Sequence, residues 1–172
     1  MGARVRSVGP VPDLPTRIPG LLLRELKVED ADAYYALLDR NRAHLGRLGD
    51  YQAEVAATPA WVRAHLGEVP DAGLRYGIRL HGELIGRVDL PAVDPPRYGT
   101  GYWLDAAHTG AGRATAACAA LYEHAARALG ATDVFAGVTH GNDRSVALLR
   151  RLGFRQVAVF ADYTRFRLRL TR

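Results

Sequence analysis

Residues 108–114, with the sequence His-Thr-Gly-Ala-Gly-Arg-Ala, have the composition of a phosphate-binding turn. They follow a strand-like stretch at 101–104 and open an alanine-rich segment that is typical of a helix. A glycine turn between a strand and a helix presents free backbone N–H groups, which bind phosphate oxygens. Arg113 would face the positive end of the helix dipole, and a bound anion would remove that conflict. The segment therefore predicts a site for a phosphate-bearing ligand, with an ordinary glycine-rich turn as the alternative.

Two polar residues, Asn142 and Ser145, lie at the start of a predicted helix that stops at Gly153. Because the two residues are three positions apart, they lie on one side of the first helical turn. Their polar groups would point beyond the N-terminus of the helix, toward a ligand. A capping asparagine followed by a solvated serine would give the same pattern, so the spacing alone leaves both interpretations open.

The glycine turn, the strand Gly-Tyr-Trp-Leu-Asp at 101–105 and the motif N-x-x-S-x-x-L-L-R-R-L-G-F at 142–154 together resemble the GNAT superfamily of acyl-CoA N-acyltransferases. The segments at 21–38 and 41–48 look like the branch that contains the Rim-type ribosomal-protein N-acetyltransferases. The resemblance implies a single α/β domain at 21–172, with a mixed, mostly antiparallel sheet flanked by helices. It also implies transfer of an acetyl group from acetyl-CoA to a primary amine of a protein N-terminus or small molecule, by direct attack in a ternary complex.

The resemblance also assigns roles to individual residues. The pyrophosphate of coenzyme A would bind the backbone of the glycine turn, and the pantetheine arm would pair with the preceding strand. The residues expected to bind the coenzyme are Tyr102, Trp103, Leu104, Thr109, Gly110, Ala111, Gly112, Arg113, Ala114 and Asn142. Ser145 would lie near the sulfur and protonate the leaving thiolate. Thr109 replaces the Gln or Arg usual in the family, but binding should survive because the phosphates contact mainly backbone N–H groups.

One group that the family usually provides is missing. Many members have a glutamate base in the strand before the glycine turn, at the position that Gly99 occupies here. Asp89, on the preceding predicted strand, is the candidate catalytic substitute, although a solvent-facing strand residue is the more common explanation of such a position. An amine can also lose its proton through water, and we expect this route to dominate.

Two other functions remain as alternatives. The net charge of +5, the pI of about 9.7 and the arginines at 165, 167 and 169 would suit an acyltransferase that acts on or from nucleic acid, such as an aminoacyl-tRNA. The absence of a contiguous basic block argues against this reading. The residues at 99 and 109, which depart from the family pattern, would suit a coenzyme-binding module without catalysis. The retained Asn142 and Ser145 argue against that interpretation.

Composition narrows the remaining possibilities. With 172 residues, 48% hydrophobic and 24% charged, the chain has the properties of one globular domain. The single cysteine, Cys118, excludes an internal disulfide and is expected in the core. The six histidines include no H-x-x-x-H pair, so no metal is predicted. We expect a cytoplasmic protein, because the N-terminal residues lack an apolar signal segment and no run approaches the ~20 apolar residues of a membrane span.

The elements that position these residues can be predicted from periodicity and capping signals. Residues 1–20, with four prolines, are expected to form a loose arm. A helix is predicted from Asp30 to Asp39, with Asp30 as its cap and Ala33, Tyr34, Leu37 and Leu38 on one face. Further helices are predicted at 41–48, 59–66 with Thr58 as N-cap, 110–129 and 142–153. Strands are predicted at 21–26, 74–80, 83–90, 98–104, 133–138, 154–160 and 163–170, with a loop at 91–97. The helical crossover before 133–138 predicts a parallel or locally splayed pairing.

Overall fold

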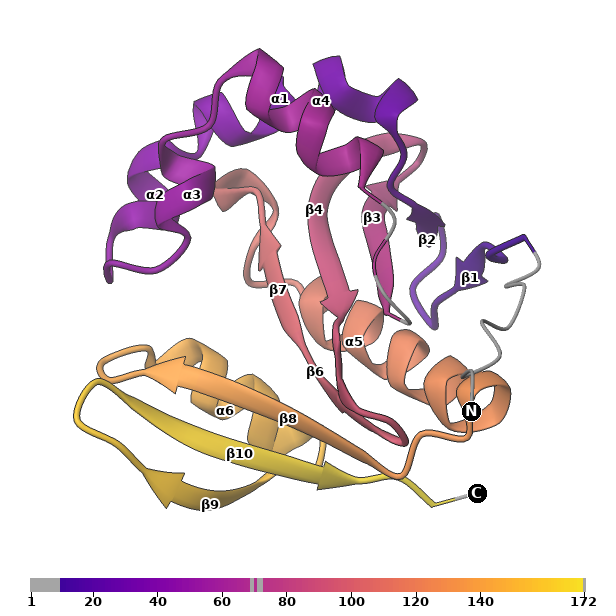
Figure 1. Cartoon of the computed structure of the whole chain (residues 1–172), viewed down its shortest axis with the longest axis vertical. Helices are drawn as coiled ribbons and strands as arrows, with labels where there is room; N and C mark the ends of the chain where they lie inside the picture. Colours follow the sequence, from indigo (N-terminus) through magenta and orange to yellow (C-terminus); the bar gives the residue numbers. More distant parts are fainter. Residues whose placement is uncertain (1–9, 69, 71–72, 172) are drawn as a thin grey trace, which may run out of the picture.

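The computed structural model describes residues 10–68, 70 and 73–171, which form two five-stranded sheets flanked by helices (Figure 1). The strands are β1 (Leu14–Pro15), β2 (Leu21–Glu25), β3 (Leu74–Leu80), β4 (Glu83–Leu90), β5 (Ala92–Asp94), β6 (Arg97–Gly99), β7 (Gly101–Leu104), β8 (Asp133–Thr139), β9 (Arg155–Val159) and β10 (Tyr163–Arg169). The helices are α1 (Ala31–Arg40), α2 (Arg42–Gly46), α3 (Gln52–Val55), α4 (Pro59–Gly67), α5 (Arg113–His124) and α6 (Asp143–Arg151). In the described part of the chain, no helix has the length and apolar character needed to cross a membrane.

The first sheet has the strand order β1-β2-β3-β4-β7 and is antiparallel throughout. The second has the order β5-β6-β8-β10-β9, and its one parallel pair in the described residues joins β6 to β8. This arrangement confirms the predicted α/β class with a mixed, mostly antiparallel sheet. The parallel pair is the one expected from the helical crossover through α5.

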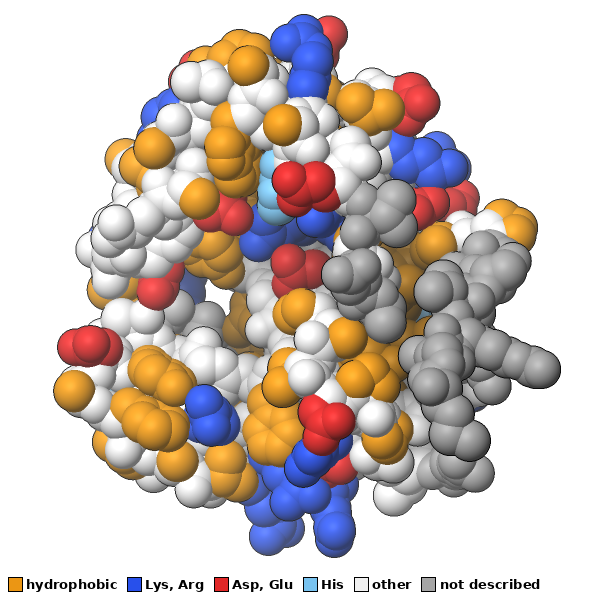
Figure 2. Space-filling model, viewed as in Figure 1, with side chains coloured by type: hydrophobic (Ala, Val, Ile, Leu, Met, Phe, Trp, Pro, Cys, Tyr) orange, Lys and Arg blue, Asp and Glu red, His pale blue; other side chains and the backbone are white. Residues whose placement is uncertain are grey.

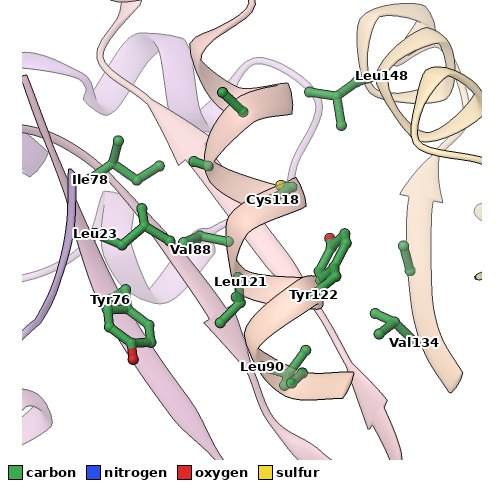
Figure 3. Packing of buried hydrophobic residues seen from close by; sticks show 14 of the residues in the cluster. Leu23, Tyr76, Ile78, Val88, Leu90, Cys118, Leu121, Tyr122, Val134 and Leu148 are labelled. Atoms are coloured by element: carbon green, nitrogen blue, oxygen red, sulfur yellow. The ribbon is translucent and has the colours of Figure 1, made fainter. Parts of the chain in front are cut away.

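Two apolar clusters hold the layers together. The larger cluster packs α5 against one face of the first sheet and against β8 and α6. Figure 3 shows Leu121 of α5 pointing toward the first sheet, near Val88, while Tyr122 points toward Val134 of β8. The smaller cluster packs α1 and α4 on the opposite face of the first sheet, around Trp103. Helix α5 therefore fixes the two sheets relative to each other.

The predicted strand 98–104 is divided at Thr100, and its halves belong to different sheets. Strand β6 pairs in parallel with β8, whereas β7 pairs with β4. Thr100 contacts both sheets, because its N–H donates to the carbonyl of Phe135 at 3.0 Å and its hydroxyl donates to that of Asp89 at 3.0 Å. Beyond this residue β7 and β8 diverge (Figure 1). The predicted single strand was therefore wrong, because the alternation of residue types continues across the division.

The predicted loop at 91–97 contains strand β5, which pairs with β6 as a short hairpin. The two prolines at 95 and 96 form the turn of this hairpin, so the signal that predicted a loop marks only its tip. The expected loose arm at 1–20 also differs in its described part. Leu14 is buried and β1 pairs with β2, which anchors the segment, while residues 1–9 lie outside the described residues.

Three details of the helices differ from the sequence-based predictions. Asp30 does not cap α1, because its carboxylate accepts the N–H of Lys27 at 3.0 Å and pairs with Arg79 at 2.7 Å. Ala33 is exposed, and Ala31 takes its place on the buried face of α1. The helix predicted at 110–129 begins at Arg113 and continues after His124 as a π-helical turn to Leu129, where Gly130 ends it as expected.

Candidate active site

The divergence of β7 from β8 leaves β7 as an edge strand of the first sheet. An edge strand presents unpaired N–H and C=O groups that an extended ligand can bind as a neighbouring strand would. The carbonyl of Tyr102 on this strand is already paired, because it accepts the hydroxyl of Tyr51 at 2.6 Å. Burial raises the pKa of Tyr51, so this phenol stays protonated and donates. The opening therefore has a polar wall that a linear ligand with amide groups could follow.

A cavity of about 840 Å³ extends from this edge to the glycine turn and the start of α6. It brings together nearly all of the residues predicted to bind the coenzyme, although they come from three separate segments. The predicted residues that line it are Tyr102, Trp103, Leu104, Thr109, Gly110, Gly112, Arg113, Ala114, Asn142 and the proposed acid Ser145. Ala111 does not line it. The structure thus places the two sequence motifs at one site.

The glycine turn presents a free helix N-terminus to this cavity. Gly112 is the N-cap residue of α5 with φ +72°, a left-handed conformation that glycine adopts without strain. No side chain caps the helix, and its first turn has no acidic residue. The guanidinium of Arg113 folds back to donate to the carbonyl of His108 at 3.1 Å. The first N–H groups of α5 are therefore available to an anion such as a phosphate.

Ser145 and Tyr102 meet at the other end of the cavity. The side-chain oxygen of Asn142 accepts the N–H of Ser145 at 3.3 Å, which is the capping geometry that the sequence left open as an alternative and which fixes the serine in the first turn of α6. Burial raises the pKa of Tyr102 to about 12, and the nearby Ser145 hydroxyl opposes this rise. The buried Tyr102 hydroxyl has no partner with hydrogen-bond geometry among the described residues. The sequence predicted only a backbone role for Tyr102, and its hydroxyl is a further polar group at this end.

Asp89 lies in a buried ion cluster outside the cavity lining. Its carboxylate is 3.6 Å from Nε of Arg87, whose Nη1 also binds Glu54 at 3.0 Å. Burial alone would lower the pKa of Arg87, but the nearby Tyr34, Asp89 and Glu54 outweigh it and raise that pKa, so the guanidinium stays charged. Gly99 lies in β6, where an added Cβ would be 3.3 Å from Pro91. Because Asp89, the candidate base, lies beside Arg87, the negative charge of its carboxylate is partly balanced by the guanidinium.

Two residues of this site were not assigned by the sequence, Asp50 and the hydroxyl of Tyr51. The sequence marks Gly49-Asp50 only as the end of a helix, and no local signal relates it to β7 or β8. The thiol of Cys118 is buried in the core, and this burial raises its pKa to about 12. This agrees with the expected core position (Figure 3).

Two of the three arginines of the last strand contact other side chains of the protein. Arg167 pairs with Asp133 at 2.7 Å, and Arg165 lies over the ring of Phe160, 5.0 Å from its centroid. Figure 2 shows Lys and Arg side chains in separate groups on the face in view. The same view shows acidic and basic side chains together in the hollow at the centre of this face. These contacts give no support to nucleic acid as the acceptor.

Comparison with known proteins gives one family and several solved structures. The family model described as an acetyltransferase (GNAT) domain matches residues 20–155. RimL, a ribosomal L7/L12 alpha-N-protein acetyltransferase solved with coenzyme A, is 22% identical with a TM-score of 0.80, covering 92% of this chain and 98% of its own. RimJ of Mycobacterium smegmatis, solved with a coenzyme A disulfide, is 22% identical with a TM-score of 0.77, covering 92% and 87%.

A third solved structure, the ribosomal-protein-S5-alanine acetyltransferase of Vibrio fischeri, is 19% identical with a TM-score of 0.78, covering 89% of this chain and 94% of its own. No curated protein matches the sequence significantly. At these identities the solved structures establish a shared fold, and the family model covers most of the chain.

Proposed function

This chain belongs to the GNAT acetyltransferase family, and we propose that it transfers the acetyl group of acetyl-CoA to a primary amine by direct attack in a ternary complex. The observation that carries the proposal is the single cavity joining the edge of β7, the free N-terminus of α5 and Ser145. Each part suits one part of acetyl-CoA. The free N–H groups suit the pyrophosphate, the strand edge suits the amides of the pantetheine arm, and the hydroxyl suits the sulfur.

In this arrangement the protein contributes mainly orientation and electrostatic stabilisation. Backbone N–H groups where β7 leaves β8 polarise the thioester carbonyl, and the acceptor nitrogen attacks its carbon. The thiolate leaves toward Ser145, which gives it a proton. Asn142 holds Ser145 in place through the helix cap. No covalent enzyme intermediate is required, since both substrates occupy the site at once.

We propose a protein or peptide N-terminus as the first acceptor to test. RimL acts on ribosomal L7/L12 and the Vibrio fischeri protein is named for alanine of ribosomal protein S5, and both share this fold. Arg167 is paired with Asp133, which removes one of the three charges that favoured a nucleic-acid acceptor. We therefore place an amine on a polypeptide before a tRNA in the order of testing.

The experiment is a thiol-release screen with acetyl-CoA against peptides with different N-terminal residues, aminoglycosides and polyamines. We expect release that depends on one acceptor class, with the acetylated amine found by mass spectrometry. A parallel titration with tRNA at two salt concentrations tests the alternative, since phosphate contacts weaken steeply with salt. Coenzyme binding without thiol release for any acceptor would support a coenzyme-binding protein that lacks catalysis. No coenzyme binding at all would contradict the proposal.

A further inference from the structure

The segment 49–51, here called the strap, links the two sheets where β7 and β8 diverge. It joins α2 to α3, which Figure 1 shows at the open end of this divergence. The Tyr51 hydroxyl binds the Tyr102 carbonyl of the first sheet at 2.6 Å. The neighbouring carboxylate of Asp50 accepts the hydroxyl of Thr139, in the second sheet, at 2.5 Å. Two consecutive residues thus bind the two strands between which the acetyl group would lie.

The backbone of the strap is held in an unfavourable conformation. Tyr51 has φ +56° and ψ +36°, in the left-handed region that bulky residues avoid. Such strain persists only where the surrounding contacts hold it, and it is concentrated at functional sites. This conformation directs the carboxylate of Asp50 to β8 while the next side chain contacts β7.

The charge around Asp50 is unusual within the cavity. Five arginines line the cavity, and among the described lining residues Asp50 is the only carboxylate. The arginines suit an anionic coenzyme, whereas one carboxylate near the acyl end suits a cation. In the described part of the chain Asp50 forms no ion pair, while Glu54 and Asp89 share Arg87. Of these three acids, Asp50 is the one free to attract an ammonium group.

We propose that Asp50 is the catalytic base of this enzyme, binding the acceptor ammonium group and removing its proton. This inference rests on the proposed acetyl transfer and replaces the water route expected from the sequence. Tyr51 is a positioning residue, because it fixes the strap to β7. Thr139 positions the carboxylate from the other sheet. Asp50 would then provide the function of the glutamate missing at Gly99, from a different segment of the chain.

The step balances in protons and electrons. The acceptor R–NH₃⁺ gives one proton to the Asp50 carboxylate, and the freed nitrogen pair forms the C–N bond to the thioester carbon. The tetrahedral intermediate collapses, and the C–S bond breaks with its electron pair on sulfur. The Ser145 hydroxyl gives its proton to the thiolate and takes up the second nitrogen proton in exchange. Asp50 returns its proton to water, so the products are the amide, coenzyme A and one released proton.

Other charged groups around the cavity affect how the rate depends on pH. Besides Tyr51 and Tyr102, the titratable side chains that line it are Arg17, His44, Arg47, Arg113, Arg144 and Arg151. His140 follows Thr139, but its ring nitrogen binds the carbonyl of Phe160 at 2.8 Å. Since arginine guanidinium groups stay charged over the accessible pH range, the other ionisable side chains besides the two tyrosines are Asp50 and the two histidines, His44 and His140. His44→Gln and His140→Gln variants should therefore accompany the pH measurements.

The test compares two variants that separate the base from the strap. Asp50→Asn keeps an oxygen that can accept the Thr139 hydroxyl but removes the basic carboxylate. Thr139→Val removes the hydrogen bond and keeps the carboxylate. Asp32→Asn, at an exposed position of α1, removes the same charge far from the cavity and serves as control. Calorimetry with coenzyme A and turnover with acetyl-CoA and a serine-terminated peptide are measured on each.

We expect Asp50→Asn to lower kcat by roughly 10²-fold with unchanged coenzyme affinity. Its rate should rise with pH toward the acceptor's own amine pKa, and this rise should replace the acidic limb of the wild type. Equal turnover in Asp50→Asn and the wild type would overturn the proposal. Loss of coenzyme binding in both Asp50→Asn and Thr139→Val would also overturn it, because it would assign Asp50 a purely structural role.

Two further outcomes distinguish this inference from the proposed function. If Asp89→Asn, and not Asp50→Asn, abolishes the acidic limb, the enzyme is an acetyltransferase with a different base, and only the inference fails. If the wild-type protein binds no coenzyme A in calorimetry, the proposed function fails and the inference fails with it. A second readout uses peptide binding to the coenzyme A-loaded protein, without turnover. There, Asp50→Asn should weaken binding of the ammonium group by roughly tenfold, and unchanged binding would count against Asp50 as its site.

Discussion

Replacing Gly112 with glutamate should strongly weaken coenzyme binding with only a small effect on folding. Gly112 has φ +72°, and nothing lies within 4 Å of a Cβ added there, so a new side chain would enter open space. The cost to folding is then that of a non-glycine residue in the left-handed region, about 1–2 kcal/mol. For a chain of this size it corresponds to a decrease in Tm of roughly 2–8 °C.

The effect on binding should be much larger. The open space at Gly112 lies at the N-terminus of α5, where the pyrophosphate is expected to approach the backbone. A glutamate carboxylate about 5 Å from a phosphate charge, in a partly exposed site, would be repelled by about 1–3 kcal/mol for each charge. Because each 1.4 kcal/mol changes affinity tenfold, the two charges of a pyrophosphate imply a loss of roughly 30-fold or more.

Gly112→Gln is the matched control, because it has the same backbone strain and nearly the same volume without the charge. Calorimetry with coenzyme A should show Gln weakening binding through steric contact and Glu weakening it further. The difference between the two variants should shrink at high salt, since screening reduces the charge repulsion. Wild-type affinity in a folded Gly112→Glu protein would refute the placement of the pyrophosphate at this turn.

Three other substitutions test the remaining parts of the site and one charged contact of the fold. Ser145→Ala should reduce turnover by about 10²-fold and leave coenzyme affinity nearly intact; unaffected turnover would show that the serine only forms part of the helix cap. Asp89→Asn should leave the shape of the pH–rate profile unchanged, because Asp89 is already paired with Arg87; a lost acidic limb would identify Asp89 as the base. Burial alone would raise the pKa of Asp105. Hydrogen bonds from Arg40, Asn41 and His108 outweigh this effect and hold the pKa of Asp105 below the usual value. A lowered pKa stabilises the fold above the unfolded-state pKa of about 4, and this stability is lost as the pH falls through the folded-state pKa. Asp105→Asn should therefore lower the free energy of unfolding at pH 7 by about 1–3 kcal/mol and flatten its decrease below pH 4, as denaturant titrations at both pH values would show.

Local signals in the sequence predicted the start of α6 and, within three residues, that of α5. The asparagine cap of α6 and the glycines before α5 act within a few residues, so their effect can be read from the sequence alone. The same holds for Thr58, whose hydroxyl accepts the N–H of Trp61 as expected. Both site helices begin at such signals. Once the fold of the family was assumed, the two motifs could therefore be expected to line the same cavity.

The missed features all depend on partners distant in the chain. Asp30 is a residue type that commonly caps helices. Its carboxylate instead binds Arg79 on β3 and the backbone N–H of Lys27. Asp50 becomes notable only because Thr139, 89 positions away, contacts it. The division at Thr100 depends on β8, which follows later in the sequence. Periodicity cannot reveal these relations, because it reports on the residues of one segment and not on what packs beside them.

Thr100 also limits how this sequence can change by insertion and deletion. Side chains alternate along β7, so Tyr102 belongs with the cluster around α5 while Trp103 packs with α1 and α4. One residue added between Gly99 and Gly101 would exchange these two faces. The hydroxyl of Tyr102 would move away from Ser145, and the indole of Trp103 would be forced against α5. Asp89 would also no longer lie opposite Gly101, the glycine that leaves room for its carboxylate. Length variants should therefore be tolerated at the β5–β6 turn, where the hairpin is exposed, and be rejected at the junction of the two sheets.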